Sequence, residues 1–188
     1  MSSSIFISSI FSLLFLMSNL MVDTSAESLI ETACSNDRLY PERTKACIKV
    51  LRSHPEIASA KNLYDLSIAI MKTGLSSFTS AQAYIKRQLK RANVGLDVKG
   101  ALIACNNSYY SGYISFNSAL SEVRDDKEYE TATYDLLVGC TDDIQSCEDN
   151  VALGKIEDPI ISRTNDLASI YGLSAYEAVN ELEQGKDV

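Results

Sequence analysis

The side chains that could carry out chemistry are one histidine, several pairs of neighbouring carboxylates and five cysteines. His54 is the only histidine. No Cys-His pair and no Gly-x-Ser-x-Gly elbow supplies a nucleophile with an evident base. Paired carboxylates can hydrolyse glycosides, but neighbouring acids on a helix are interpreted here as a solvated face. These pairs are Asp125-Asp126, Asp142-Asp143 and Glu148-Asp149. The sequence therefore predicts no catalytic residue and no cofactor.

The cysteines indicate disulfide bonds rather than a metal site. No two of them have the close spacing of a zinc site, and His54 stands apart from all of them. We therefore predict no metal ligands. An odd number of cysteines leaves one thiol outside any set of bridges. The five are Cys34, Cys47, Cys105, Cys140 and Cys147.

The first 26 residues have the composition of a secretory signal peptide. Met1 to Met21 contains no charged side chain and is largely apolar, and small residues ending at Ala26 follow where a signal peptidase would cut. Serines interrupt the apolar run, which leaves it short of the roughly 20 uninterrupted apolar residues that the alternative, a membrane anchor, would need. We therefore expect residues 1–26 to be removed and residues 27–188 to form one secreted domain. Its expected location is extracellular.

The acidic charge of the chain narrows the choice of partner. The whole chain has a formal charge of −8, and the predicted signal peptide contains only one charged side chain, Asp23. Nucleic acids and anionic membranes repel such a protein, so we expect neither as a partner. The expected partner of the mature domain is another protein, bound by a monomer.

Apolar residues in the mature chain recur at three- and four-residue steps, which is typical of amphipathic helices. No stretch shows the sustained alternation of a strand. Four apolar stripes joined by short polar connections predict an all-α fold, an up-down-up-down four-helix bundle. The first stripe is one long helix or two helices broken near Gly74, and the last follows Pro159 with Ser162 or Thr164 as its N-cap. The stripes are Leu63 to Leu89, Leu102 to Val123, Ala132 to Val151 and Leu167 to Leu182.

An N-terminal helical hairpin is predicted ahead of the bundle. A short amphipathic segment leads to Cys34, a polar turn follows (Ser35 to Arg38), and Thr44 to Arg52 carries Cys47. A bridge between these cysteines would lock together two helices that are too short to persist alone.

A second bridge is expected within the bundle. Cys105 lies on the second stripe and Cys147 on the third, and these two helices should be antiparallel neighbours. Closing this loop would stabilise the fold by roughly 4 kcal/mol. Cys140 lies on the same stripe as Cys147 and could compete for Cys105, but we expect it to remain a buried thiol outside the bridges.

Several polar features have two interpretations. The cationic residues at the end of the first stripe are interpreted as an exposed helix face, and the alternative is a contact for an acidic partner surface or for the galacturonate of pectin. Tyr109 should be buried and Tyr110 more exposed. Asn106-Asn107-Ser108 is an N-glycosylation sequon, so Asn106 is a candidate glycan site. The cationic residues are Lys86, Arg87, Lys90 and Arg91.

Together these segments resemble the plant invertase inhibitor and pectin methylesterase inhibitor family over the whole mature chain. The resemblance implies a four-helix bundle with an N-terminal hairpin, and bridges that join the first cysteine to the second and the third to the fourth. By position, Cys147 rather than Cys140 matches the fourth cysteine. The residues that carry the resemblance are Thr32-Ala33-Cys34, Tyr40 to Cys47, Ala101-Leu102-x-x-Cys105-x-x-x-Tyr109, Glu130-Thr131-Ala132 to Cys147-Glu148-Asp149, and Asn165-x-Leu167-Ala168.

The resemblance implies a proteinaceous inhibitor that binds one enzyme molecule and occludes its active site. Some members of the family bind pectin methylesterase through the middle bundle helices. Others bind invertase through a Pro-Lys-Phe motif that precedes the helix corresponding to the third stripe. The corresponding residues here are Lys127, Glu128 and Tyr129, the predicted target contacts. Glu128 replaces a cation that would meet catalytic carboxylates, which favours pectin methylesterase over invertase. A secreted helical module without inhibitory activity is the alternative from another class.

Overall fold

The computed structural model describes residues 28–35, 41–91 and 95–185. The predicted signal peptide, residues 1–26, and most of the polar turn Ser35 to Arg38 lie outside these ranges. Within them all regular secondary structure is helical, so the predicted all-α class is confirmed. None of the helices in these ranges is both long and apolar enough to cross a membrane.

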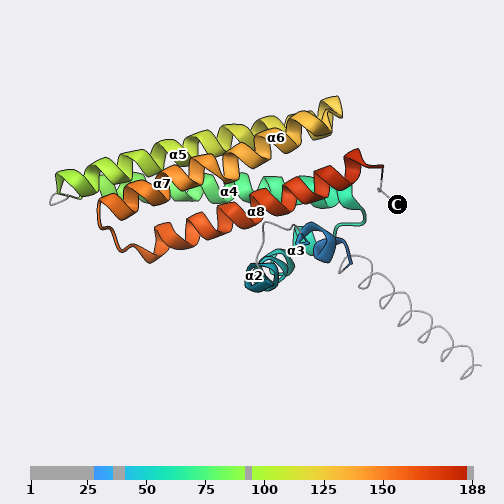
Figure 1. The fold of residues 1–188 in the computed structure, drawn as a ribbon, viewed down its shortest axis with the longest axis horizontal. Helices are drawn as coiled ribbons and strands as arrows, with labels where there is room; N and C mark the ends of the chain where they lie inside the picture. The colour runs from blue at the N-terminus through green and yellow to red at the C-terminus, as the bar shows by residue number, and fades with distance from the viewer. Residues whose placement is uncertain (1–27, 36–40, 92–94, 186–188) are drawn as a thin grey trace, which may run out of the picture.

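Four long helical rods lie side by side in the described part of the chain (Figure 1). Helix α4 packs against α5 and α8, and the consecutive helices α6 and α7 pack against the same two neighbours, so the rods share one core. The helical residues 28–33 and helices α2 and α3 form a smaller unit on one side of α8 and α4. The elements are α2 (Pro41–Arg52), α3 (Pro55–Ala58), α4 (Leu63–Leu89), α5 (Leu96–Ser121), the π-helical turn η1 (Glu122–Asp126), α6 (Tyr129–Cys140), α7 (Asp142–Leu153) and α8 (Pro159–Glu183).

Helix α4 is continuous, so Gly74 does not break it. Asn62 caps its first turn by accepting a hydrogen bond from the Asp65 backbone N–H at 2.7 Å. Gly74 is buried where α4 meets α5, and a Cβ built there would lie 2.5 Å from a ring carbon of Phe116. The glycine is therefore explained by close helix packing and not by a bend.

The third predicted stripe, Ala132 to Val151, is divided into α6 and α7, which continue in nearly the same direction (Figure 1). Thr141 separates them, with φ −105° and ψ −72°. Its hydroxyl donates to the carbonyl oxygen of Leu137 at 2.7 Å and contacts Asp142 Oδ1 at 3.0 Å, which satisfies polar groups at the break. The apolar stripe continues across this break, which is why periodicity alone predicts a single element.

The predicted N-cap of α8 is wrong. Asp158, rather than Ser162 or Thr164, caps the helix, because its Oδ1 accepts from the backbone N–H groups of Ile160 and Ile161 at 2.9 and 3.3 Å. Proline is favoured at the first helical position, and Pro159 occupies it.

Two disulfide bonds are present among the described residues. Cys34–Cys47 ties the first helical segment to α2, and Cys105–Cys147 ties α5 to α7. These are the pairs that the resemblance implies. Cys140 lies outside both, is 2% exposed, and donates to the carbonyl of Leu137 at 3.5 Å.

Candidate target-binding surface

A groove of about 690 Å³ runs along the outer face of α4, and we call it the α4 groove. It forms because the apolar residues of α4 turn toward α5 and α8, which leaves small and polar side chains on the opposite face. Ala69, Ser76 and Ser80 keep the floor of the groove low. The lining residues are His54, Glu56, Tyr64, Asp65, Ile68, Ala69, Lys72, Thr73, Ser76, Ser77, Ser80, Arg124 and Tyr171.

One wall of the groove comes from the segment that joins the hairpin to the bundle. His54 Nε2 lies 2.9 Å from the Tyr171 hydroxyl, and His54 Nδ1 lies 3.5 Å from Glu56 Oε1. Thr73 on α4 donates to the same Glu56 oxygen at 3.4 Å. Burial, with the nearby Glu56 carboxylate, raises the pKa of the Tyr171 hydroxyl. These bonds connect α3, α4 and α8, so the wall is fixed to the bundle.

The opposite wall includes Arg124 of η1, and Lys127, the residue after η1, lies beside it. Arg124 donates two hydrogen bonds to the Asp125 carboxylate at 2.8 and 2.7 Å, which lowers the pKa of that carboxyl to about 2. Lys127 adopts a left-handed backbone conformation with φ 62°. Its ammonium nitrogen lies 4.1 Å from the centre of the Tyr64 ring, a cation–π contact with the first turn of α4.

The three predicted target contacts have different environments. Lys127 is exposed and lies beside the α4 groove through Tyr64. Glu128 is exposed at the N-terminus of α6 and makes no side-chain capping bond there. Tyr129 is half-buried and packs against the core. Of these three residues, Lys127 alone contacts a residue that lines the α4 groove, Tyr64, and no local sequence pattern connects the two.

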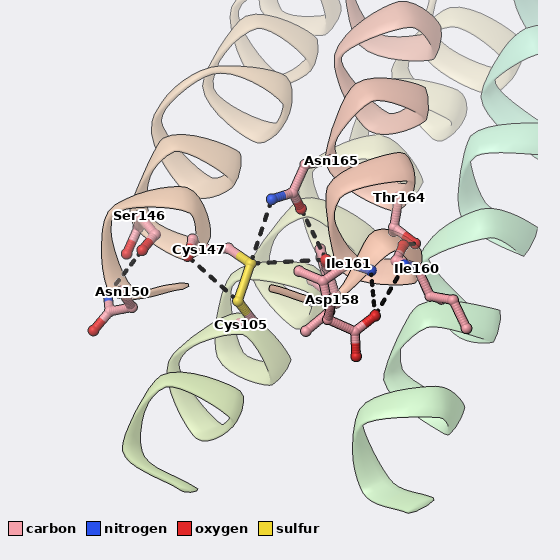
Figure 2. The surroundings of a disulfide bond; sticks show 10 residues. Cys105, Ser146, Cys147, Asn150, Asp158, Ile160, Ile161, Thr164 and Asn165 are labelled. Carbon is pink, nitrogen blue, oxygen red and sulfur yellow. Dashed lines mark hydrogen bonds between the residues drawn. A yellow bond between two sulfur atoms is a disulfide. The ribbon is translucent and has the colours of Figure 1, made fainter. Parts of the chain in front are cut away.

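A second polar cluster is enclosed in the core (Figure 2). Asn165 of α8 points at the sulfur of Cys147, with Nδ2 at 3.6 Å, and its Oδ1 accepts a hydrogen bond from the Tyr109 hydroxyl at 2.8 Å. Tyr109 is 1% exposed, and desolvation raises the pKa of its hydroxyl. Because a binding partner cannot reach these groups, their role is to hold α5, α7 and α8 together.

The carboxylate pairs lie at exposed or half-buried positions in the described part of the chain. Asp142 and Asp143 begin α7, and Glu148 and Asp149 lie in its middle. The pKa of Asp143 and that of Glu148 are raised, in both cases chiefly by burial. No group of three or more His, Cys, Asp or Glu side chains in the described ranges is arranged to hold a metal ion.

The predicted glycan site lies within α5. Asn106 is half-buried, and its Oδ1 atom is buried without a hydrogen-bond partner. Ser108, the third residue of the sequon, is 6% exposed. Nearby, Tyr109 is buried and Tyr110 is 58% exposed, which agrees with the helical spacing.

The sequence did not identify the residues that build the groove walls. Tyr64, Arg124 and Glu56 come from three different elements. They lie around one groove only because of how these elements pack. One available signal was the run of small polar residues in α4, Ser76, Ser77 and Ser80, opposite an apolar stripe.

The fold and this surface define a rigid helical binding domain with a solvent-open groove. The family model described as plant invertase/pectin methylesterase inhibitor matches residues 28–174, which is most of the chain. The chain therefore belongs to the plant invertase/pectin methylesterase inhibitor family. No curated protein matches the sequence.

Proposed function

We propose that the mature protein is a secreted inhibitor of pectin methylesterase that binds one enzyme molecule through the α4 groove and its Lys127 edge. Family membership supports a protein that inhibits pectin methylesterase or invertase. The choice of esterase, the single-molecule stoichiometry and the location in the cell wall belong to this proposal.

The stiffness of the surface supports docking without rearrangement. The groove wall at His54 is hydrogen-bonded to α8 and α4, and Lys127 beside the groove contacts the Tyr64 ring. The two disulfides tie the first helical segment to α2 and α5 to α7. A surface that is already ordered loses little conformational entropy on binding. The groove is also open to solvent along its length, which suits a protein surface better than a small ligand that needs an enclosed pocket.

The exposed carboxylate of Glu128 is the observation that carries the choice of target. A glycoside hydrolase such as invertase has catalytic carboxylates in its cleft, and a second carboxylate inserted beside them would be repelled. Glu128 has no ion-pair partner within 4.0 Å among the described residues, so its charge is not neutralised within the domain.

Titration of purified residues 27–188 into pectin methylesterase and acid invertase assays, near the pH of the apoplast, tests the proposal. Inhibition of the esterase that saturates at an equimolar ratio, with invertase unaffected, is the expected result. Inhibition of invertase alone would contradict the choice of target, and inhibition of neither enzyme would contradict the proposed function.

Invertase inhibition is the second candidate because Tyr129 retains the aromatic residue of the family motif. The variant Glu128→Lys tests it directly, since this change restores the cation. If charge repulsion excludes invertase, the variant should gain inhibition of that enzyme while Glu130→Lys, a matched reversal of another exposed acid on α6, should not.

A further inference from the structure

The charges of the protein are divided between its two halves. Residues 41–91, which contain the hairpin helix α2 and α4, hold ten Lys and Arg against three Asp and Glu. Residues 122–185 hold four against sixteen. Helices α6 and α7 belong to the acidic half and pack on α5 and α8, across the bundle from α4. An acidic protein therefore presents one cationic side.

The strongest concentration of positive charge is the last turns of α4. Lys86, Arg87, Lys90 and Arg91 are all exposed, and we call them the cationic end of α4. At about 1.5 Å of rise per residue they lie within roughly 8 Å along the helix axis. The spacing of one, three and four residues places Lys86, Arg87 and the C-cap residue Lys90 on one side of α4.

These four cations have no carboxylate partner within 4.0 Å among the described residues. The Asp158 carboxylate comes close to this region, since it accepts a hydrogen bond from the Tyr84 hydroxyl at 2.6 Å. Its other contacts are the backbone N–H groups at the start of α8. Arg87 lies 5.9 Å from the centre of the Tyr84 ring, a weak contact that leaves the guanidinium charge exposed.

The cationic end also conflicts with the local rules of helix stability. Lys86 and Arg87 lie in the last turn of α4, Lys90 is its C-cap residue and Arg91 follows it, so four like charges gather at one end of the helix. Cations favour a helix C-terminus through its dipole, but that dipole amounts to about half a charge and four cations exceed it. Local conflicts of this kind are expected at functional sites.

We infer that the cationic end of α4 binds de-esterified pectin, a polymer of galacturonate carboxylates. A flexible linear polyanion needs a row of exposed cations and no deep pocket, which is what this turn of helix provides. An acidic protein surface is less favoured because protein interfaces centre on desolvated apolar anchors, and Leu89 within this turn packs against the core.

The inference rests on the proposed function, because pectin methylesterase converts neutral methyl esters into these carboxylates. Lys86 lies about 33 Å along α4 from Tyr64, whose ring contacts Lys127, and about 9 Å from Ser80, the groove residue nearest to it along the chain. The Lys127 edge of the proposed enzyme-binding surface and the cationic end therefore lie at opposite ends of α4. Binding to the polymer would keep the inhibitor where the enzyme has already acted and raise its effective concentration there.

Binding of the full mature domain to polygalacturonate, measured without any enzyme, tests the inference. We expect binding to the de-esterified polymer that weakens as salt rises from about 50 to about 200 mM, and none to fully methyl-esterified pectin. Substitution of all four cations by glutamine should weaken binding about tenfold, because it removes the four charges that the polymer would contact.

A matched variant removes four exposed cations from the hairpin side, Arg43, Lys45, Lys49 and Lys61, and should change binding less than about threefold. Equal losses in both variants would overturn the inference, because the attraction would then depend on net charge alone. Equal binding to esterified pectin, or tighter binding to poly-glutamate than to polygalacturonate, would also overturn it. The glutamine variant should inhibit pectin methylesterase normally, so failure of polymer binding and failure of inhibition are distinguishable.

Discussion

The enclosed cluster around Cys105–Cys147 and the open α4 groove differ in almost every physical respect. In the cluster, Tyr109 and Asn165 are buried and bonded to each other. In the groove, serines and a lysine face solvent, and the main internal contacts lie at the walls. The comparison indicates that the first region determines stability and the second determines recognition. Changes in one should therefore leave the property of the other intact.

Loss of the interior disulfide should have the largest effect on stability. The paired substitution Cys105→Ala and Cys147→Ala opens a loop with a sequence separation of 42 residues. We expect a loss of about 4 kcal/mol in the free energy of unfolding. Denaturant unfolding of oxidised protein measures it. An unchanged unfolding midpoint would contradict the role of the cluster.

Addition of a methyl group at Gly74 should come next. The new Cβ would lie 2.5 Å from the Phe116 ring, so the ring or the helix must move. We expect Gly74→Ala to cost about 1–3 kcal/mol. Gly100→Ala on α5 is the control, because nothing lies within 4 Å of its Cβ and alanine favours a helix. If both variants are stabilised, the packing of α4 on α5 is looser than described.

Removal of the Tyr109 hydroxyl isolates one hydrogen bond. Tyr109→Phe leaves Asn165 Oδ1 without its donor at 2.8 Å, and we expect a loss of about 1–2 kcal/mol. Tyr110→Phe, one residue later and exposed, should change the unfolding midpoint very little. Inhibition by both variants should equal that of the parent protein at temperatures where both are folded.

The pH dependence of stability should be the smallest of these effects. Burial raises the pKa values of Glu122, Asp143 and Glu148 above their ordinary values. The folded state therefore holds these protons more tightly than the unfolded state, and their stabilising contribution is lost as pH rises through the raised pKa values.

The thermal midpoint should accordingly fall as pH rises above the ordinary titration range of a carboxyl group. Glu148→Gln should flatten this dependence, whereas Glu183→Gln at the exposed end of α8 should leave the slope as it is. A midpoint that rises with pH over this range would show that other groups dominate.

Local signals predicted much of the fold, and tertiary contacts account for what they missed. Helical periodicity predicted the positions of α4, α5 and α8, because each buries a continuous stripe. It missed the Thr141 break, since the stripe continues through it. The contact of Lys127 with Tyr64 joins residues far apart in the chain, which no local pattern encodes.

The charge of the cationic run was visible in the sequence, but its lack of partners was not. Exposure and the absence of nearby carboxylates required the packed structure. The cap of α8 at Asp158 is different, because the pair Asp158-Pro159 already carried that signal.

Inhibition of pectin methylesterase by a groove-filling variant is the most direct test of the α4 groove as the enzyme-binding surface. Ser76→Arg places a long side chain on the exposed floor of the α4 groove, and Ser146→Arg makes the same change on the exposed face of α7. We expect Ser76→Arg to raise the apparent inhibition constant at least about tenfold and Ser146→Arg to leave it unchanged. Both unfolding midpoints should stay close to that of the parent protein. Full inhibition by Ser76→Arg would contradict the assignment of the α4 groove as the enzyme-binding surface.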